Sequence, residues 1–182
     1  MNKIFIIGLA GSGKTFLANK LKNRLNYPTY TTDWILYEKD TDLKRIKLSE
    51  KEYLKNIDKI LAQNKWIVEG VHYFEKIALD ADLILFLDTP IYKNILGIIR
   101  RYLTDKEYRK TYKLRDSLAL IHKTVAGYYS TPKEELLYYP KYKGRKKYQK
   151  VLEKHRGKVK VVRNIQTYLK SPDPPPILVN NT

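Results

Sequence analysis

The chain has 182 residues, enough for about one domain with a full hydrophobic core. It contains no cysteine, which excludes disulfides, thiol catalysis and cysteine-ligated zinc or iron–sulfur centres and suits a cytoplasmic location. The apolar start is broken by glycines and lacks a cleavage pattern, so we expect no signal peptide. The sequence contains no run of about 18 apolar residues, so we predict no membrane-spanning segment.

The net charge of +17 is unevenly distributed. Between Lys93 and Arg163, 21 Lys and Arg stand against 6 Asp and Glu, a net charge of +15. Such a positive charge attracts nucleotides and would equally attract RNA or DNA. The alternative is a lysine-rich surface that is simply solvated and binds no acidic partner. Many of the 16 tyrosines lie among these lysines. This pattern fits stacking on single-stranded nucleic acid as well as it fits helix packing.

Residues 4–17, "IFIIGLAGSGKTFL", lead from an apolar run through a glycine-rich loop into a helical pattern. Gly8, Gly13, Lys14 and Thr15 satisfy the phosphate-loop motif G-x-x-x-x-G-K-[ST]. The motif predicts loop amides around the α- and β-phosphates of ATP, Lys14 on the β- and γ-phosphates, and the Thr15 hydroxyl on Mg²⁺. The expected nucleotide-binding residues of this segment are Gly8, Ala10, Gly11, Ser12, Gly13, Lys14, Thr15 and Phe16.

The surroundings of the loop favour this interpretation over an ordinary glycine-rich turn. Residues 3–7 read as a buried strand, and Leu17, Leu21 and Leu25 recur on one face of a helix. A strand before the loop and a helix after it direct the positive end of the helix dipole at the phosphates.

The following segments predict strands that each end in a carboxylate. "YPTYTTD" (27–33) runs out to Asp33, "WIVEG" (66–70) contains Glu69, and "DLILFLDTP" (82–90) ends in Asp88. Between the first two, a capping box at Ser49 and Glu52 begins a helix over about 50–64.

The second half of the chain continues the alternation. A helix begins at Ile91 and carries Arg100 and Arg101, a polar stretch covers 104–113, and a further helix follows Leu114. A tyrosine-rich connection leads into a basic helix near 144–156, a last strand over 158–162 and a short helix capped by Asn164. Residues 1–170 therefore predict one α/β domain with a parallel sheet covered on both faces. Residues 171–182 predict a proline-rich disordered tail.

Together, the phosphate loop, the strands ending in Asp33, Glu69 and Asp88, the paired arginines and the late basic helix resemble adenylate-kinase-like P-loop proteins. Within that group the pattern is most similar to the DNA topology modulation (FlaR-type) or adenylate-kinase-related proteins. The resemblance implies a three-layer fold, sheet order 2-3-1-4-5, a helical lid over about 100–140, and phosphoryl transfer from ATP. One departure concerns the acceptor: the chain has "EGVHY" where nucleoside monophosphate kinases carry D-G-x-P-R.

The needs of phosphoryl transfer, together with the resemblance, assign roles to individual residues. Glu69 corresponds to the carboxylate behind Mg²⁺, with Asp88 the competing candidate or a cap for the Thr89–Pro90 turn. Asp33 would orient or deprotonate the acceptor, unless it only caps a following helix. Lid-side Arg100 and Arg101, with Arg109 and Arg115 nearby, would offset transition-state charge, and Arg163 would flank adenine. For His72 we expect no metal role.

The sequence thus predicts a Mg²⁺-dependent, ATP-binding phosphotransferase, or an ATPase, that acts on a nucleoside, nucleotide or other small metabolite. The alternative is a nucleic-acid-binding P-loop protein, such as a nucleic-acid end kinase or a regulator of DNA topology. A GTPase switch is disfavoured, because no D-x-x-G follows the loop and "NKWI" (64–67) lacks the aspartate of N-K-x-D. The acceptor and the oligomeric state stay open.

Overall fold

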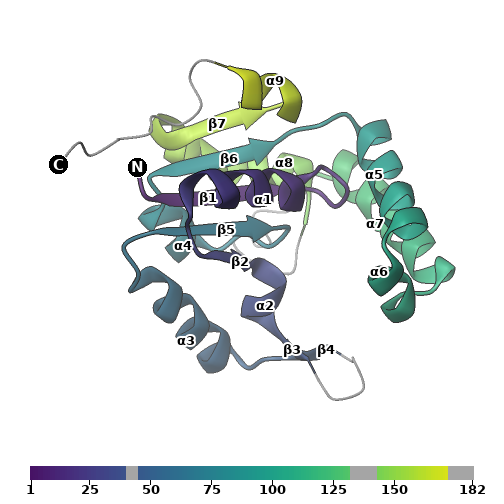
Figure 1. The fold of residues 1–182 in the computed structure, drawn as a ribbon, viewed down its shortest axis with the longest axis horizontal. Helices are drawn as coiled ribbons and strands as arrows, with labels where there is room; N and C mark the ends of the chain where they lie inside the picture. The colour runs from purple at the N-terminus through teal and green to yellow at the C-terminus, as the bar shows by residue number, and fades with distance from the viewer. Residues whose placement is uncertain (40–44, 132–142, 172–182) are drawn as a thin grey trace.

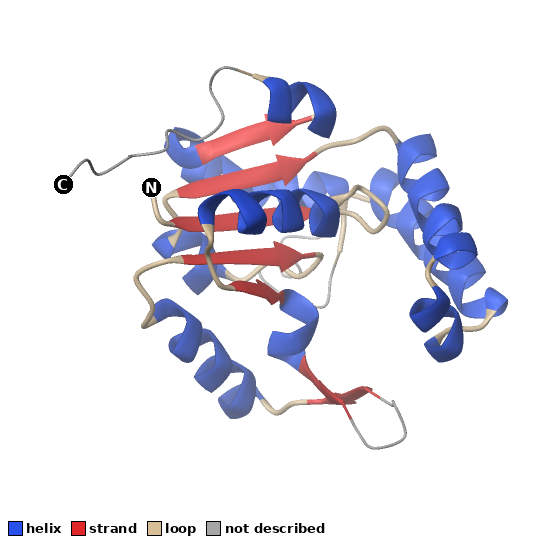
Figure 2. Cartoon of the chain, in the orientation of Figure 1, coloured by secondary structure: helices blue, strands red, loops and turns tan. Residues whose placement is uncertain are grey.

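A five-stranded parallel sheet forms the centre of the computed structural model, which describes residues 1–39, 45–131 and 143–171 (Figures 1 and 2). Its strands are β1 (Lys3–Gly8), β2 (Thr29–Thr31), β5 (Trp66–Gly70), β6 (Leu83–Leu87) and β7 (Val159–Val162). They stand in the order β2-β5-β1-β6-β7. Counted along the chain this is 2-3-1-4-5, so the predicted fold class and strand order are confirmed.

Helices cover both faces of the sheet because the strand side chains alternate. Ile4 and Ile6 point to one face and pack with α1 (Lys14–Leu25) and α9 (Ile165–Lys170). Phe5 and Ile7 point to the other and pack with α3 (Glu50–Leu61), α4 (Glu75–Asp80) and α8 (Arg145–Leu152). The central strands are apolar on both faces, as expected for a sheet buried on both sides.

The segment predicted as one strand over 27–33 is shorter than expected. Only Thr29–Thr31 pair with β5, and the Thr31 side chain then accepts a hydrogen bond from the Trp34 amide, which begins α2 (Thr32–Leu36). Asp33 therefore lies in the first turn of a helix, and Thr31 is the cap. An antiparallel hairpin of β3 (Tyr37–Lys39) and β4 (Arg45–Lys47), which the sequence did not predict, follows α2.

Local hydrogen bonds define where several helices begin. The predicted capping box of Ser49 and Glu52 is present at the start of α3, which ends at Leu61, three residues before the expected end. The Asn164 side chain accepts from the amides of Gln166 and Thr167, so its predicted role as the cap of α9 is confirmed. The basic segment near 144–156 divides into α8 and a 3₁₀ segment over Glu153–Lys158.

Three helices extend beyond the carboxyl ends of the strands: α5 (Ile91–Thr104), α6 (Lys106–Thr111) and α7 (Leu114–Tyr129) (Figure 1). The polar stretch over 104–113 contains α6, which Asp105 caps by accepting from the Tyr108 amide. We call these three helices the arm. They occupy most of the predicted lid; residues 132–140 of that lid and 172–182 of the predicted tail lie outside the described residues.

Among the described helices none is long and apolar enough to cross a membrane.

Candidate functional site

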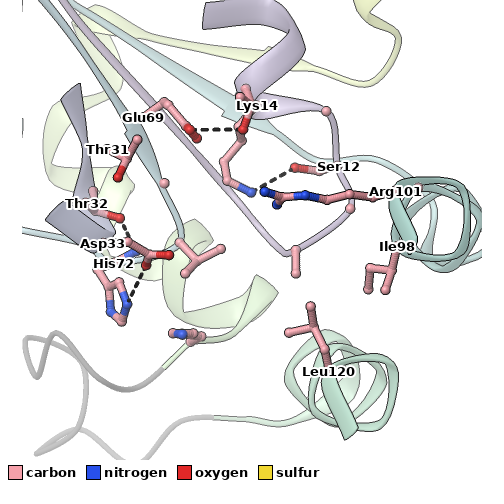
Figure 3. Close-up of a pocket in the computed structure, with 18 of the residues that line it drawn as sticks. Ser12, Lys14, Thr31, Thr32, Asp33, Glu69, His72, Ile98, Arg101 and Leu120 are labelled. Carbon is pink, nitrogen blue, oxygen red and sulfur yellow. Dashed lines mark hydrogen bonds and ion pairs between the residues drawn. The ribbon is translucent and has the colours of Figure 1, made fainter. Parts of the chain in front are cut away.

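A cleft of about 2030 Å³ opens where the parallel strands end, between α2, α3 and the arm. Residues 10–16, the phosphate loop and first turn of α1, line one side, and the arm contributes Ile98, Arg101 and Leu120 (Figure 3). Ligands of open parallel sheets bind at this edge, because helix N-termini and strand carboxyl ends meet there. The cleft is therefore the candidate binding site.

The phosphate loop takes the conformation that its glycines allow. Gly11 and Gly13 have φ of 76° and 91°, which side chains disfavour, and Gly13 directly precedes α1. The Lys14 ammonium group turns back over the loop and donates to the carbonyl oxygen of Leu9 at 2.7 Å, with the Ser12 hydroxyl at 3.5 Å. Gly8 ends β1 beneath the loop, where an added Cβ would lie 2.7 Å from the carbonyl oxygen of Leu87.

Lys14 is a buried cation in a site with several charged neighbours. Loss of hydration lowers its pKa to about 8, although the negative charges of Glu69 and Asp33 oppose the change. The cations Lys143 and Arg101 lower it further. An anion in the loop would favour the charged form, since the ammonium group has little water to stabilise it.

Thr15 and Glu69 come from different elements and meet at the cleft. The Thr15 hydroxyl at the start of α1 donates to Oε1 of Glu69 at 3.0 Å, and Glu69 belongs to β5, the strand next to β1. Burial raises the pKa of Glu69, and Lys14 and the Thr15 hydrogen bond act against this rise. A hydroxyl beside a buried carboxylate offers the oxygen ligands that Mg²⁺ accepts together with phosphates and water.

The donor set fits Mg²⁺ bound with a nucleotide better than a metal held by protein alone. Among the described residues no group of three or more His, Cys, Asp or Glu could hold a metal ion. Mg²⁺ in phosphoryl-transfer sites uses one or two protein groups and takes its other ligands from phosphates and water. Thr15 and Glu69 could supply such a pair.

Asp88, the competing metal candidate, is engaged elsewhere. Its carboxylate accepts two hydrogen bonds from the Arg145 guanidinium, from Nε at 2.5 Å and Nη2 at 2.7 Å. This pair ties the end of β6 to the start of α8, and the Asp88 charge raises the pKa of Arg145. The suggested capping of the Thr89–Pro90 turn by Asp88 is not observed: the Thr89 hydroxyl instead bonds Oδ1 of Asn94 on α5.

Asp33 faces the cleft from α2, opposite the loop, and has a buried histidine behind it (Figure 3). Nε2 of His72 lies 3.4 Å from Oδ1 of Asp33, and the His72 side chain is only 1% exposed. The backbone amide of His72 donates to the Thr32 hydroxyl, so the turn after β5 is attached to α2. Sequence reasoning gave His72 no role, because its proximity to Asp33 depends on two segments far apart in the chain.

The arginines divide into those that reach the cleft and those that do not. Arg100, Arg101 and Arg163 line it, and Arg101 extends from α5 towards Ser12 and Lys14 (Figure 3). Its guanidinium also lies 4.6 Å from the ring centroid of Tyr108. Arg109 donates to the Leu103 carbonyl at the end of α5, and Arg115, beside Asp116, is 81% exposed, so within the described residues both lie off the cleft lining.

Two glycines bring the loop and the arm into backbone contact. A Cβ on Gly11 would lie 1.9 Å from the carbonyl oxygen of Asn94, and one on Gly97 would lie 2.3 Å from the carbonyl oxygen of Gly11. Gly97 interrupts an otherwise good helical pattern in α5, which is the sequence signal for such a close approach. The phosphate loop and α5 are therefore positioned together.

No protein-family model matches the chain, and no curated protein matches its sequence. Among solved structures, a gluconokinase from Sinorhizobium meliloti 1021 matches with 17% identity and a TM-score of 0.44, over 74% of this chain and 78% of that one. The assignment to the FlaR-type or adenylate-kinase-related group stays a prediction.

Replacing Gly97 by alanine tests the contact between loop and arm. Alanine favours a helix by about 1 kcal/mol over glycine, but here its methyl group would meet the Gly11 backbone, and such overpacking costs roughly 1–3 kcal/mol. We expect Gly97→Ala to lower the free energy of unfolding measured in urea. The matched control is Gly157→Ala, where an added Cβ meets nothing within 4 Å. A Gly97→Ala variant at least as stable as the wild type would show that the contact relaxes freely.

Proposed function

We propose that the chain is an ATP-binding, Mg²⁺-dependent small kinase that transfers the γ-phosphoryl group to a small acceptor. The observation that carries the proposal is the cluster of Lys14, Thr15 and Glu69, with the Thr15 hydroxyl 3.0 Å from Glu69, at the carboxyl end of a parallel sheet. The same cluster would support ATP hydrolysis if water were the acceptor.

Each part of the donor site has a distinct task. The amides of the loop and the N-terminus of α1 would bind the phosphate oxygens, and the Lys14 ammonium would exchange the Leu9 carbonyl for the β- and γ-phosphates. Thr15 and Glu69 would hold Mg²⁺, which neutralises phosphate charge when bound. Phe16 lies at the edge of the loop, and Arg163, after β7, would flank the base.

On the acceptor side, Asp33 is the group suited to orient a hydroxyl or accept its proton. Its side chain is 41% exposed, and Nε2 of the buried His72 lies 3.4 Å from its carboxylate. Arg100 and Arg101 approach from the arm and would offset charge on the transferred phosphoryl group. Because the arm contacts the loop through Gly97, these arginines would keep a defined distance from phosphates bound in the loop.

Part of the positive charge of the second half of the chain lies around the cleft. Lys93, Arg100, Arg101, Lys123, Lys143 and Arg163 all line the cleft. A cleft lined by cations attracts polyphosphates and speeds their arrival. Binding of RNA or DNA by the rest of this charge stays a prediction that no contact described above tests.

Removing the Lys14 ammonium tests the donor site. We expect Lys14→Ala to weaken ATP binding by roughly 100-fold, because it deletes a buried cation directed at the phosphates. Titration calorimetry in the presence of Mg²⁺ measures the affinity. Lys22→Ala on the exposed side of α1 is the control and should bind like the wild type. Wild-type protein that binds no ATP, or equal affinities for the two variants, would refute the proposal.

The lowered pKa of Lys14 predicts a pH dependence of ATP binding. Because the pKa is about 8 in the free protein, Lys14 loses its proton as pH rises through 8, and binding must then restore that proton. The affinity should fall by up to tenfold per pH unit between about pH 8 and 9.5, as proton linkage requires. A Lys14→Met variant should show weaker binding with no decline over the same range. A wild-type affinity that stays constant to pH 9.5 would contradict the assignment.

Glu69 and Asp88 can be separated by their effects on Mg²⁺. Glu69→Gln keeps the shape but removes the charge, so the Mg²⁺ concentration for half-maximal ATP binding should rise roughly 10- to 100-fold. Asp88→Asn should lower stability by loss of the Arg145 pair and leave the Mg²⁺ requirement nearly unchanged. Glu38→Gln, also in the cleft, is the control. The reverse pattern would move the metal role to Asp88.

A further inference from the structure

One face of the arm carries exposed apolar side chains at helical spacing. On α5 these are Tyr92, Leu96, Ile99 and Leu103, which are 58%, 59%, 41% and 62% exposed. Their spacing of four, three and four residues returns each side chain to the same face of the helix. It is the spacing of the seam between helices in bundles and coiled coils.

The neighbouring helix α7 repeats the pattern. Leu114, Leu118, Ile121 and Val125 have the same spacing, and Tyr129 follows one turn later. Leu114, Leu118 and Tyr129 are 55%, 57% and 64% exposed, and the two between them are half-buried. We call these two rows on α5 and α7 the arm stripes.

The arm stripes lie on one side of the helix pair. The chain reverses direction through α6, so α5 and α7 pack against each other in opposite directions (Figure 1). Ile98 on α5 and Leu120 on α7 face each other at the cleft (Figure 3). At about 100° per residue, the stripe on each helix lies roughly 130° around the helix axis from that residue, counted in the same direction along the chain. In antiparallel helices, equal rotations of the same sense bring both stripes to the same side of the pair, away from the cleft.

The size of this surface is close to what a specific interface needs. The seven most exposed side chains leave on the order of 600–700 Å² open, more than the roughly 300–600 Å² of the largest patch on a typical monomer. Stable pairs of proteins cover roughly 800 Å² on each partner. A two-fold axis sets the same face of two copies against each other, so the apolar face of one helix pair would meet the apolar face of the other.

We infer that the arm stripes bind a second copy of this chain, giving a two-fold dimer whose arms form a four-helix bundle behind the two clefts. The inference does not rest on the proposed function, since none of the stripe residues lines the cleft. The chain carries a net charge of +17, so two copies repel each other when they approach. Added salt screens this repulsion and therefore favours the dimer.

Sedimentation equilibrium of the full chain over a range of concentrations tests this inference. We expect the wild type to dimerise with Kd of about 1–10 μM, and the dimer to tighten when NaCl is raised. Leu96→Glu on α5 and Leu118→Glu on α7 should each weaken it by roughly tenfold or more, because each places a charge in an apolar interface.

Leu79→Glu is the matched control, because Leu79 is 62% exposed on α4, outside the arm. It should dimerise like the wild type. Circular dichroism verifies that all three variants keep their helix content, as exposed positions allow. A wild type that stays monomeric well above 10 μM, a dimer that dissociates with added salt, or a loss with Leu79→Glu equal to that with Leu96→Glu would overturn the inference.

Discussion

The site depends on the burial of one ammonium group. Inside the phosphate loop the Lys14 ammonium group loses most of its hydration. It is stabilised instead by a hydrogen bond to a carbonyl oxygen at 2.7 Å and by the negative charges of Glu69 and Asp33. This compensation is incomplete, which is why its pKa falls to about 8. A polyphosphate would supply the missing negative charge, so the loop gains more from an anion than an exposed lysine would.

The parallel sheet makes this arrangement possible. Because β1 and β5 run side by side, Gly8 and Glu69 end at the same edge, and α1 returns Thr15 to the Glu69 carboxylate. The paired Asp88 and Arg145 fix the neighbouring strand end to α8. One strand-end carboxylate thus faces the loop, while the other holds the fold together.

The arm connects this site to the rest of the surface. Its inner side brings Arg101 towards the loop, and the backbone contact between Gly11 and Gly97 fixes its distance from that loop. Its outer side carries the arm stripes. If a second copy covers those stripes, contacts between the two copies would help to hold α5, and with it the arginines that line the cleft, in position. Side chains on opposite faces of α5 would then link assembly to the geometry of the cleft.

The sequence by itself was enough to predict the parallel sheet, the glycine-rich loop and the helix that follows it. Strong local signals explain this: apolar runs of strand length, the spacing of Gly8, Gly13, Lys14 and Thr15, and the capping residues Ser49 and Asn164. These signals act between near neighbours, so they can be read without knowledge of the fold.

Only the tertiary structure decided how distant residues are paired. The choice between Glu69 and Asp88 depends on which carboxylate meets Thr15 and which meets Arg145, and both partners come from other elements. His72 behind Asp33 and Gly97 against Gly11 are likewise contacts between segments about 40 and 90 residues apart in the chain. Such pairs form through packing of the whole sheet and its helices, and no short-range pattern in the sequence encodes them.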